Sequence, residues 1–372
     1  EVEEENDFGM ELESVIAGQL PPPRQDKATK CQEAESLVFG FIQNMRRHLQ
    51  LSFLPVLCRP IGVGSTFEGW NPCEDDSIYC FLVPLKAPRG HTFHIEPGTA
   101  GETTARNFCI RVGLLCTCTA ERWAKMRCFL HHPEDELKET EAPSLLHTLC
   151  TNSFLDVEKI AHWFSQNVKA VWKALPQSSQ CGLTVLPSSR SCKFQVTGGR
   201  ERSLTIEMIF GVQQGNSDVY LSSQALEATL TPSTMWPESY AVAEVKLFRH
   251  MTRQAPKNLV HLRCLRTCAH ILGSTNFSTY SLKTVVMHLL TTTSLSSHHG
   301  TFYIRHVLTI MHYLRGCLEE KRLNHFFFGN KNVPKEIILP PDLLTAEPVN
   351  LFQHLPHNPD AHAKAWSDFN LL

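Results

Sequence analysis

The chain has 372 residues, of which 42% are hydrophobic and 19% are charged, and its formal net charge is −2 at pH 7. This composition is sufficient for a sizeable core, which excludes wholesale disorder, and a pI near 6.9 argues against a dedicated nucleic-acid-binding protein. No apolar run approaches the roughly eighteen residues that a transmembrane helix needs, so no segment of the sequence is predicted to span a bilayer.

The charge is unevenly distributed along the chain. Residues 1–13 hold seven acids and no base, which leaves a net charge of +5 on the other 359 residues. Residues 1–32, with three consecutive prolines at 21–23, show no sustained period and are predicted to form an acidic, proline-rich linker. Because the sequence starts at Glu1 and not at Met, we expect a missing upstream segment, in which any membrane anchor would lie.

The fourteen cysteines are scattered and contain no C-x-x-C pair. Their density is below that of a disulfide scaffold, so we expect mainly reduced, buried thiols and a cytosolic compartment.

The first predicted helix follows the linker. Its apolar residues recur at helical spacing on one face: Leu37, Val38, Phe41, Ile42, Met45 and Leu49. A strand is predicted at 77–83, closed by Pro84, and further strands are predicted at 107–118 and 124–131. A second helix is predicted to begin after the N-cap Asp156 and to end at Pro176.

A β-hairpin and a series of helices follow. Residues 192–196 and 203–212 flank Gly198-Gly199, and in the second strand every alternate residue from Leu204 to Phe210 is apolar, which places Glu207 on the opposite face. After Pro237 the period becomes helical, over 239–253, 257–272, 278–291, 301–322 and 359–371. The sequence therefore predicts an α+β chain with a mixed-sheet core at 33–238 and a helical C-terminal lobe at 239–372.

Gly64-Ser65, followed by acidic residues and an apolar strand, is a layout found in metal-dependent nucleotidyltransferases. In such enzymes the backbone N–H groups of a short Gly-Ser turn hold a triphosphate, and two carboxylates two apart on one strand face bind Mg²⁺. A third carboxylate from a neighbouring strand completes a two-metal site.

Several longer motifs make a more specific resemblance. In order and spacing they resemble the inositol trisphosphate receptor-interacting protein family over residues 35–370: Ile61-Gly-Val-Gly-Ser-Thr-Phe-Glu-Gly-Trp70, Phe81-Leu-Val-Pro84, Trp163-Phe164, Ser217-Asp-Val-Tyr220, Trp236-Pro-Glu-Ser239, Tyr280-Ser-Leu-Lys-Thr284, His325-Phe-Phe-Phe-Gly-Asn330 and Ala346-Glu-Pro-Val-Asn-Leu-Phe-Gln-His-Leu355. The last motif is most similar to the family's "-like" members. That family belongs to the male-abnormal (Mab) group, which resembles cyclic GMP-AMP synthase, so the resemblance implies a nucleotidyltransferase-like core with a helical lobe.

The departures from the enzymatic pattern concern the metal-binding strand. Family members commonly have an Asp where this chain has Cys80, and an active enzyme would have its other carboxylate at Ile78. A neutral thiol and an aliphatic side chain are poor ligands for Mg²⁺, which prefers oxygen. Glu74 and Asp76 have the right spacing but lie in a polar, turn-like approach, and Glu207 falls near the third acidic place. We interpret Glu74, Asp75 and Asp76 as a solvated charge cluster and Glu207 as an exposed strand residue; the alternative is a residual metal site.

Three other groups of residues suggest possible sites. Cys116, Cys118, Cys128 and His131 offer zinc-type ligands at a non-standard spacing, with buried free cysteines as the alternative. A basic stripe at 246–266 suits phosphates or a solvated helix face. The aromatic run at 326–328 and the apolar segment at 351–355 suit a docking surface or a seal of the helical lobe.

These observations predict a non-catalytic, nucleotidyltransferase-like interaction domain with no cofactor. The family resemblance implies a single-pass membrane protein whose span lies outside the sequence. It also implies a protein partner, such as a membrane receptor of the inositol trisphosphate receptor type, with no nucleic acid expected. Two alternatives remain open: a residual nucleotidyltransferase that uses Glu74, Asp76 and Glu207, and a sensor of a nucleotide or inositol phosphate at Gly64-Ser65.

Overall fold

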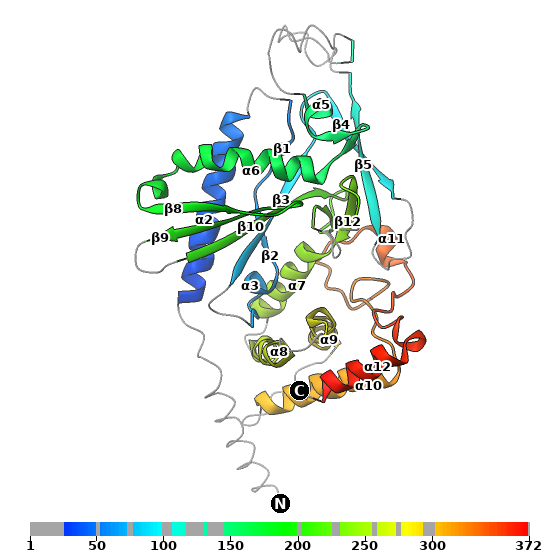
Figure 1. Ribbon diagram of the computed structural model, residues 1–372. Helices are drawn as coiled ribbons and strands as arrows, with labels where there is room; N and C mark the ends of the chain where they lie inside the picture. The colour runs from blue at the N-terminus through cyan, green and yellow to red at the C-terminus, as the bar shows by residue number, and fades with distance from the viewer. Residues whose placement is uncertain are drawn as a thin grey trace, which may run out of the picture. The chain divides into compact units, whose positions relative to one another are not determined.

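The computed structural model describes residues 26–49, 53–72, 77–98, 106–116, 130–131, 144–198, 203–224, 231–254, 259–272, 277–292 and 302–370. The chain is α+β, as predicted, and divides into two compact units (Figure 1). One unit contains residues 29–64 and 78–242 and includes the sheet. The other contains the described residues 26–28 at the start of the first helix, together with residues 65–77 and 243–372, and is mainly helical.

The described strands form one mixed sheet. Its main path runs β1-β3-β10-β11-β12-β5-β7-β6, while β2 pairs with β3, β4 with β5, and β8 with β9. Pairing is parallel between β3 and β10 and antiparallel in the other recorded strand pairs of the described residues. The strands are β1 (Val56–Leu57), β2 (Ile61–Val63), β3 (Ile78–Lys86), β4 (His91–Pro97), β5 (Asn107–Leu114), β6 (Cys150–Thr151), β7 (Phe154–Leu155), β8 (Cys181–Leu186), β9 (Cys192–Gly198), β10 (Ser203–Gln213), β11 (Tyr220–Ser222) and β12 (Met235–Ser239).

Two helices cover one face of this sheet, α2 (Asp26–His48) and α6 (Val157–Lys173) (Figure 1). Phe41 of α2 contacts Phe194 of β9 with ring centroids 5.3 Å apart, and Phe164 of α6 contacts Phe210 of β10 at 5.2 Å. All four rings are fully buried, so these apolar stripes form the core of the unit. Helix α2 begins at Asp26, inside the segment predicted as a linker.

Helix α6 confirms the predicted N-cap. The Asp156 carboxylate accepts hydrogen bonds from the backbone N–H groups of Glu158 and Lys159, at 3.0 and 3.1 Å. Its other oxygen accepts from the hydroxyls of Thr151 and Ser233, at 2.7 and 2.8 Å. The cap therefore also ties the start of the helix to the end of β6 and to Ser233, which is 77 positions away. The unit's other short helices are α5 (Leu145–Thr148) and η1 (Pro176–Ser179).

We predicted that this strand would end at Pro84, but β3 continues to Lys86. On one side β3 pairs with β10 from Ile78 to Pro84. On the other side β2 pairs with β3 as far as Leu82, and β1 pairs with it from Leu85. Pro84 therefore lies in the gap between two short partner strands, where its missing N–H breaks no ladder hydrogen bond on that side.

Arg190 holds together the loop between β11 and β12. Its guanidinium is buried and donates to the backbone carbonyl of Ser223 at 2.8 Å and to that of Met235 at 2.7 Å. It also donates to the carbonyls of Thr231 and Pro232, at 3.3 and 3.2 Å. One side chain thus binds backbone on both sides of residues 225–230.

The helical unit contains the elements α3 (Ser65–Glu68), most of α7 (Ala241–Gln254), α8 (Leu259–Leu272), α9 (Thr279–Thr292), α10 (Phe302–Glu319), α11 (Pro341–Leu344), η3 (Leu355–His357) and α12 (Pro359–Phe369). Phe326, Phe327, Phe328, Phe352 and Leu355 are buried, so the two apolar segments seal this unit. Among the helices described, none combines the length and hydropathy that crossing a bilayer requires.

Candidate functional site

The parallel pair of β3 and β10 brings together two of the residues that the sequence marked. Glu207 of β10 lies directly beside Cys80 of β3, and Thr205 lies beside Ile78. Ile206, Met208 and Phe210 are fully buried on the opposite face, against the helices. The prediction that Glu207 faces away from that core is therefore confirmed, and it lies next to Cys80, the residue that the sequence analysis compared with a metal-binding carboxylate.

The Gly-Ser turn begins at the same point of the sheet. Val63, the last residue of β2, pairs with Cys80, and Gly64 follows it with a φ of +83°. Only glycine adopts this backbone conformation at little cost. The carbonyl of Ser65, which begins α3, accepts from the backbone N–H groups of Gly69 and Trp70, both at 3.0 Å. Gly64, Cys80 and Glu207 thus meet around one position of strand β3.

The chemistry at this position is that of one carboxylate and one neutral thiol. The Glu207 carboxylate accepts a hydrogen bond from the Ser191 hydroxyl at 2.7 Å, and Lys193 of β9 is its register partner on the other side. Burial raises the pKa of Cys80 to about 12, and the charge of Glu207 adds to this while Lys193 opposes it. A protonated thiol is a poor ligand for a hard cation, so β3 contributes no oxygen ligand here.

The remaining predicted site residues are only partly described. Glu74 and Asp76 lie outside the described residues, as do Cys118 and Cys128. Of the zinc candidates, Cys116 and His131 lie close together, with 3.7 Å between the thiol sulfur and Nδ1, and both are exposed. Within the described part of the chain, no three His, Cys, Asp or Glu side chains are grouped as a metal site requires.

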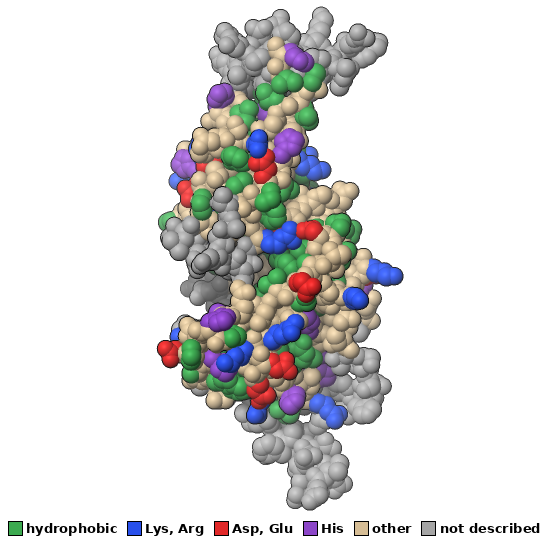
Figure 2. Space-filling view, turned by 90° about the vertical axis from the view of Figure 1, so that its right-hand side faces the viewer, with side chains coloured by type: hydrophobic (Ala, Val, Ile, Leu, Met, Phe, Trp, Pro, Cys, Tyr) green, Lys and Arg blue, Asp and Glu red, His purple; other side chains and the backbone are tan. Residues whose placement is uncertain are grey.

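Most described residues of the basic stripe are exposed to solvent, and they lie on two helices. Lys246, Arg249 and Arg253 of α7 and Arg263 of α8 are exposed. On the face shown in Figure 2, Lys and Arg side chains are interspersed with Asp and Glu, without a broad patch of one sign. This pattern differs from the concentrated positive surface that nucleic-acid-binding proteins use.

A buried ionic cluster in the helical unit was missed by the sequence reasoning. The Lys283 ammonium of α9 lies 2.7 Å from Glu68 Oε1 and 2.6 Å from Glu244 Oε2. Trp70 Nε1 donates to Glu68 Oε2 at 2.5 Å. The exposed fractions of Glu68, Lys283 and Glu244 are 3%, 5% and 6%, so all three charges are removed from solvent.

The cluster contains two carboxylates and one ammonium, and their mutual interactions shift the pKa values of Lys283 and Glu68. Burial by itself would lower the pKa of Lys283, but Glu244 and Glu68 hold it above its ordinary value, so the ammonium is charged. Burial raises the pKa of Glu68, a shift that Lys283 opposes and the neighbouring Glu244 increases. The one available signal was that Lys283 interrupts an apolar helix, between Leu282 and Val285.

Comparison with known proteins identifies close relatives by sequence. The chain is 32% identical over 374 residues to the rat protein named inositol 1,4,5-trisphosphate receptor-interacting protein-like 1, across 97% of this chain and 68% of that protein. The mouse protein of the same name gives 32% over 372 residues with the same coverage. The human inositol 1,4,5-trisphosphate receptor-interacting protein is 28% identical across 79% of this chain and 57% of its own length. No family model matches the chain.

Proposed function

Because the chain belongs to the inositol 1,4,5-trisphosphate receptor-interacting protein family, we propose that it is a protein-binding domain whose partner is a membrane receptor of the inositol 1,4,5-trisphosphate receptor type. The names of these relatives support a receptor-interacting role. We propose further that the domain is a nucleotidyltransferase-like pseudoenzyme, in which the fold is kept for binding and the phosphoryl-transfer chemistry is lost.

The observation that carries the pseudoenzyme proposal is Cys80 beside Glu207. A two-metal transfer site needs carboxylates from two adjacent strands to hold both ions, and the ions then neutralise the charge of the triphosphate. In this chain the β3 side of the pair offers a protonated thiol and the aliphatic Ile78, while the β10 side offers one carboxylate that already accepts from Ser191. A single carboxylate holds Mg²⁺ weakly, because the ion dehydrates reluctantly.

The binding role is tested by immobilising the 372-residue chain and measuring its association with the purified cytosolic region of an inositol 1,4,5-trisphosphate receptor by biolayer interferometry. Saturable binding at micromolar concentration or below supports the proposal. Absence of binding, with the receptor fragment folded and competent for its own ligand, contradicts this choice of partner.

The loss of catalysis is tested separately by thermal shift with ATP or GTP, each with and without Mg²⁺ or Mn²⁺, since a ligand that binds the native state raises its melting temperature. We expect no metal-dependent stabilisation. A nucleotide shift that needs metal and is abolished in Glu207→Gln, but kept in the exposed control Glu158→Gln, would favour a residual nucleotidyltransferase. A metal-independent shift with inositol phosphate would favour an anion sensor.

Membrane anchoring through a segment outside the 372 residues is also a proposal, which rests on the family resemblance. We propose that the folded domain faces the cytoplasm, consistent with its many free thiols, such as the buried Cys192, Cys264 and Cys268. Fractionation of cells that express the full-length protein, with protease protection of an epitope placed in this domain, tests both the anchoring and the side.

A further inference from the structure

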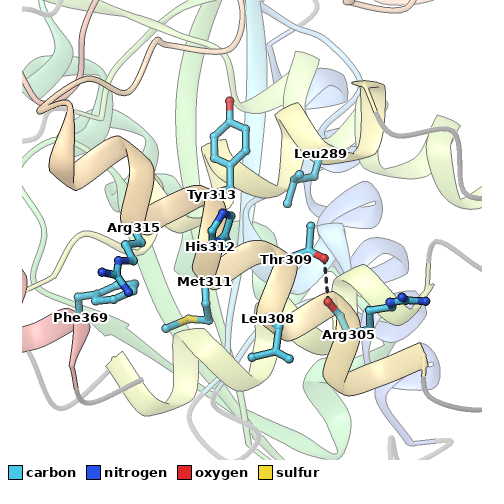
Figure 3. Close-up of a pocket in the computed structure, with 9 residues that line it drawn as sticks. All are labelled: Leu289, Arg305, Leu308, Thr309, Met311, His312, Tyr313, Arg315 and Phe369. Atoms are coloured by element: carbon cyan, nitrogen blue, oxygen red, sulfur yellow. Dashed lines mark hydrogen bonds between the residues drawn. The ribbon is translucent and has the colours of Figure 1, made fainter. Parts of the chain in front are cut away.

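A groove lies along the solvent side of α10, between α9 and α12, and has a volume of about 590 Å³. Its floor is apolar and includes Leu289, Leu308, Met311 and Phe369, drawn in Figure 3. Leu308 is 61% exposed, the highest value among the large hydrophobic side chains described. An exposed side chain of this kind inside an apolar groove is typical of a docking site.

The charges of this groove, which we call the α10 groove, have one sign. Arg305 and Arg315 line it together with His312 and the apolar residues, and no carboxylate lines it among the described residues. With Leu308 they follow one another at spacings of three and four, so they form one face of α10. Arg315 pairs with Glu319 at 2.9 Å, but both side chains are more than half exposed, so this pair contributes little and is readily exchanged.

The chain itself contains a segment with the complementary chemistry. Residues 1–13 carry seven acids and no base, and Phe8, Leu12, Val15 and Ile16 recur at spacings of four, three and one. Such a pattern combines one apolar stripe with acidic flanks, as in segments that lay an apolar face into a groove with a basic rim. These residues lie outside the described part of the structure.

We propose that the acidic segment 1–20 of this chain binds in the α10 groove. Its apolar residues cover Leu308 and the neighbouring floor, and its acids pair with Arg305 and Arg315. Length permits this: the linker from residue 17 to the start of α2 at Asp26 spans up to about 30 Å when extended, and the whole segment up to about 85 Å. The first residues of α2, 26–28, belong to the same compact unit as α10.

The proposal is tested in the full 372-residue chain with the photoreactive residue p-benzoylphenylalanine in place of Leu308. After irradiation at low micromolar concentration, cross-linked peptides are mapped by mass spectrometry. We expect intramolecular cross-links to residues 1–20. The same probe at Ile95, an exposed apolar residue of β4, serves as the matched control and is expected to give none in that segment.

Charge reversal and competition then test the recognition. The double variant Arg305→Glu/Arg315→Glu is expected to lower the cross-link yield about tenfold, because two exposed ion pairs contribute roughly threefold each. The control Arg322→Glu, at an exposed arginine outside the groove, leaves it unchanged. A synthetic peptide of residues 1–20 competes, whereas the peptide with its acids changed to amides does not.

Three results would overturn the proposal. In the first, the probe at position 308 forms cross-links outside residues 1–20. In the second, cross-links form only between two copies of the chain and increase with concentration. In the third, the double charge reversal leaves the cross-link yield unchanged. The first two outcomes would assign the groove to another segment or to a second copy of the chain. None of these measurements depends on receptor binding or on nucleotide binding.

Discussion

Replacing Lys283 by methionine is expected to destabilise the helical unit strongly. The substitution keeps the length of the side chain but removes the ammonium that lies 2.7 and 2.6 Å from two buried carboxylates. Removing one partner of a buried ion pair costs about 3–5 kcal/mol, because the remaining charge stays desolvated. Here two carboxylates lose the same cation, so the lower end of this range, about 3 kcal/mol, is the minimum expected loss in free energy of unfolding.

Urea unfolding of the full chain, followed by tryptophan fluorescence, measures this loss. The pH dependence supplies a second readout with a defined sign. Burial already raises the pKa of Glu68, and without Lys283 the folded state binds still more protons than the unfolded state near and above the ordinary glutamate pKa. The deficit of the variant should therefore grow as the pH rises above the ordinary glutamate pKa. Further replacement of Glu68 and Glu244 by glutamine should recover much of the stability, because the uncompensated charges are then absent.

A matched control distinguishes this account from a general effect of removing a lysine. Lys364 of α12 is exposed, and Lys364→Met should change the free energy of unfolding by less than about 0.5 kcal/mol. The buried ion pairs do not stabilise the unit as described if Lys283→Met lowers the free energy of unfolding no more than this control does. The same conclusion follows if the loss does not depend on pH.

Three further outcomes are expected. Cys80→Asp should place a second carboxylate beside Glu207, lower the melting temperature without metal, and make Mn²⁺ stabilising in thermal shift; no response to Mn²⁺ would contradict the vestigial-site geometry. Burial lowers the pKa of His261 to about 4, so its contribution to stability is complete above about pH 6.5 and is lost as the pH falls toward 4; His261→Phe should flatten the stability curve in that window, and exposed His270→Phe should not. Asp156→Ala should lower the free energy of unfolding by about 2 kcal/mol in urea titration, because four donors lose their acceptor; a loss below about 0.5 kcal/mol would refute the cap.

The fold was largely predictable because its helices carry one apolar stripe each and its central strands alternate. The stripe from Ile160 to Trp172 became the buried face of α6, and the alternation through Met208 placed Glu207 correctly. The predicted strand end at Pro84 is wrong because a proline is tolerated in a central strand when it lies in the gap between two partner strands. The sequence alone does not give the register of those partner strands.

The candidate site was predictable only where two neighbouring strands carry it. Glu207 beside Cys80 follows from alternation and the expected strand order, whereas the cluster of Glu68, Glu244 and Lys283 does not. Glu68 and Lys283 are 215 positions apart, and charged residues on helices are usually solvated, so only the three-dimensional structure shows that these are buried together.

The anchoring of the β11–β12 loop by Arg190 has a practical consequence for working with this protein. Because the guanidinium binds the carbonyl of Ser223 on one side of residues 225–230 and those of Thr231 and Pro232 on the other, the two ends of that stretch are fixed independently of what joins them. A short epitope or fluorophore-binding tag inserted at 225–230 should therefore leave the melting temperature nearly unchanged, since lengthening an anchored loop costs little entropy. This position offers an internal label that leaves both chain ends free for the binding and topology experiments.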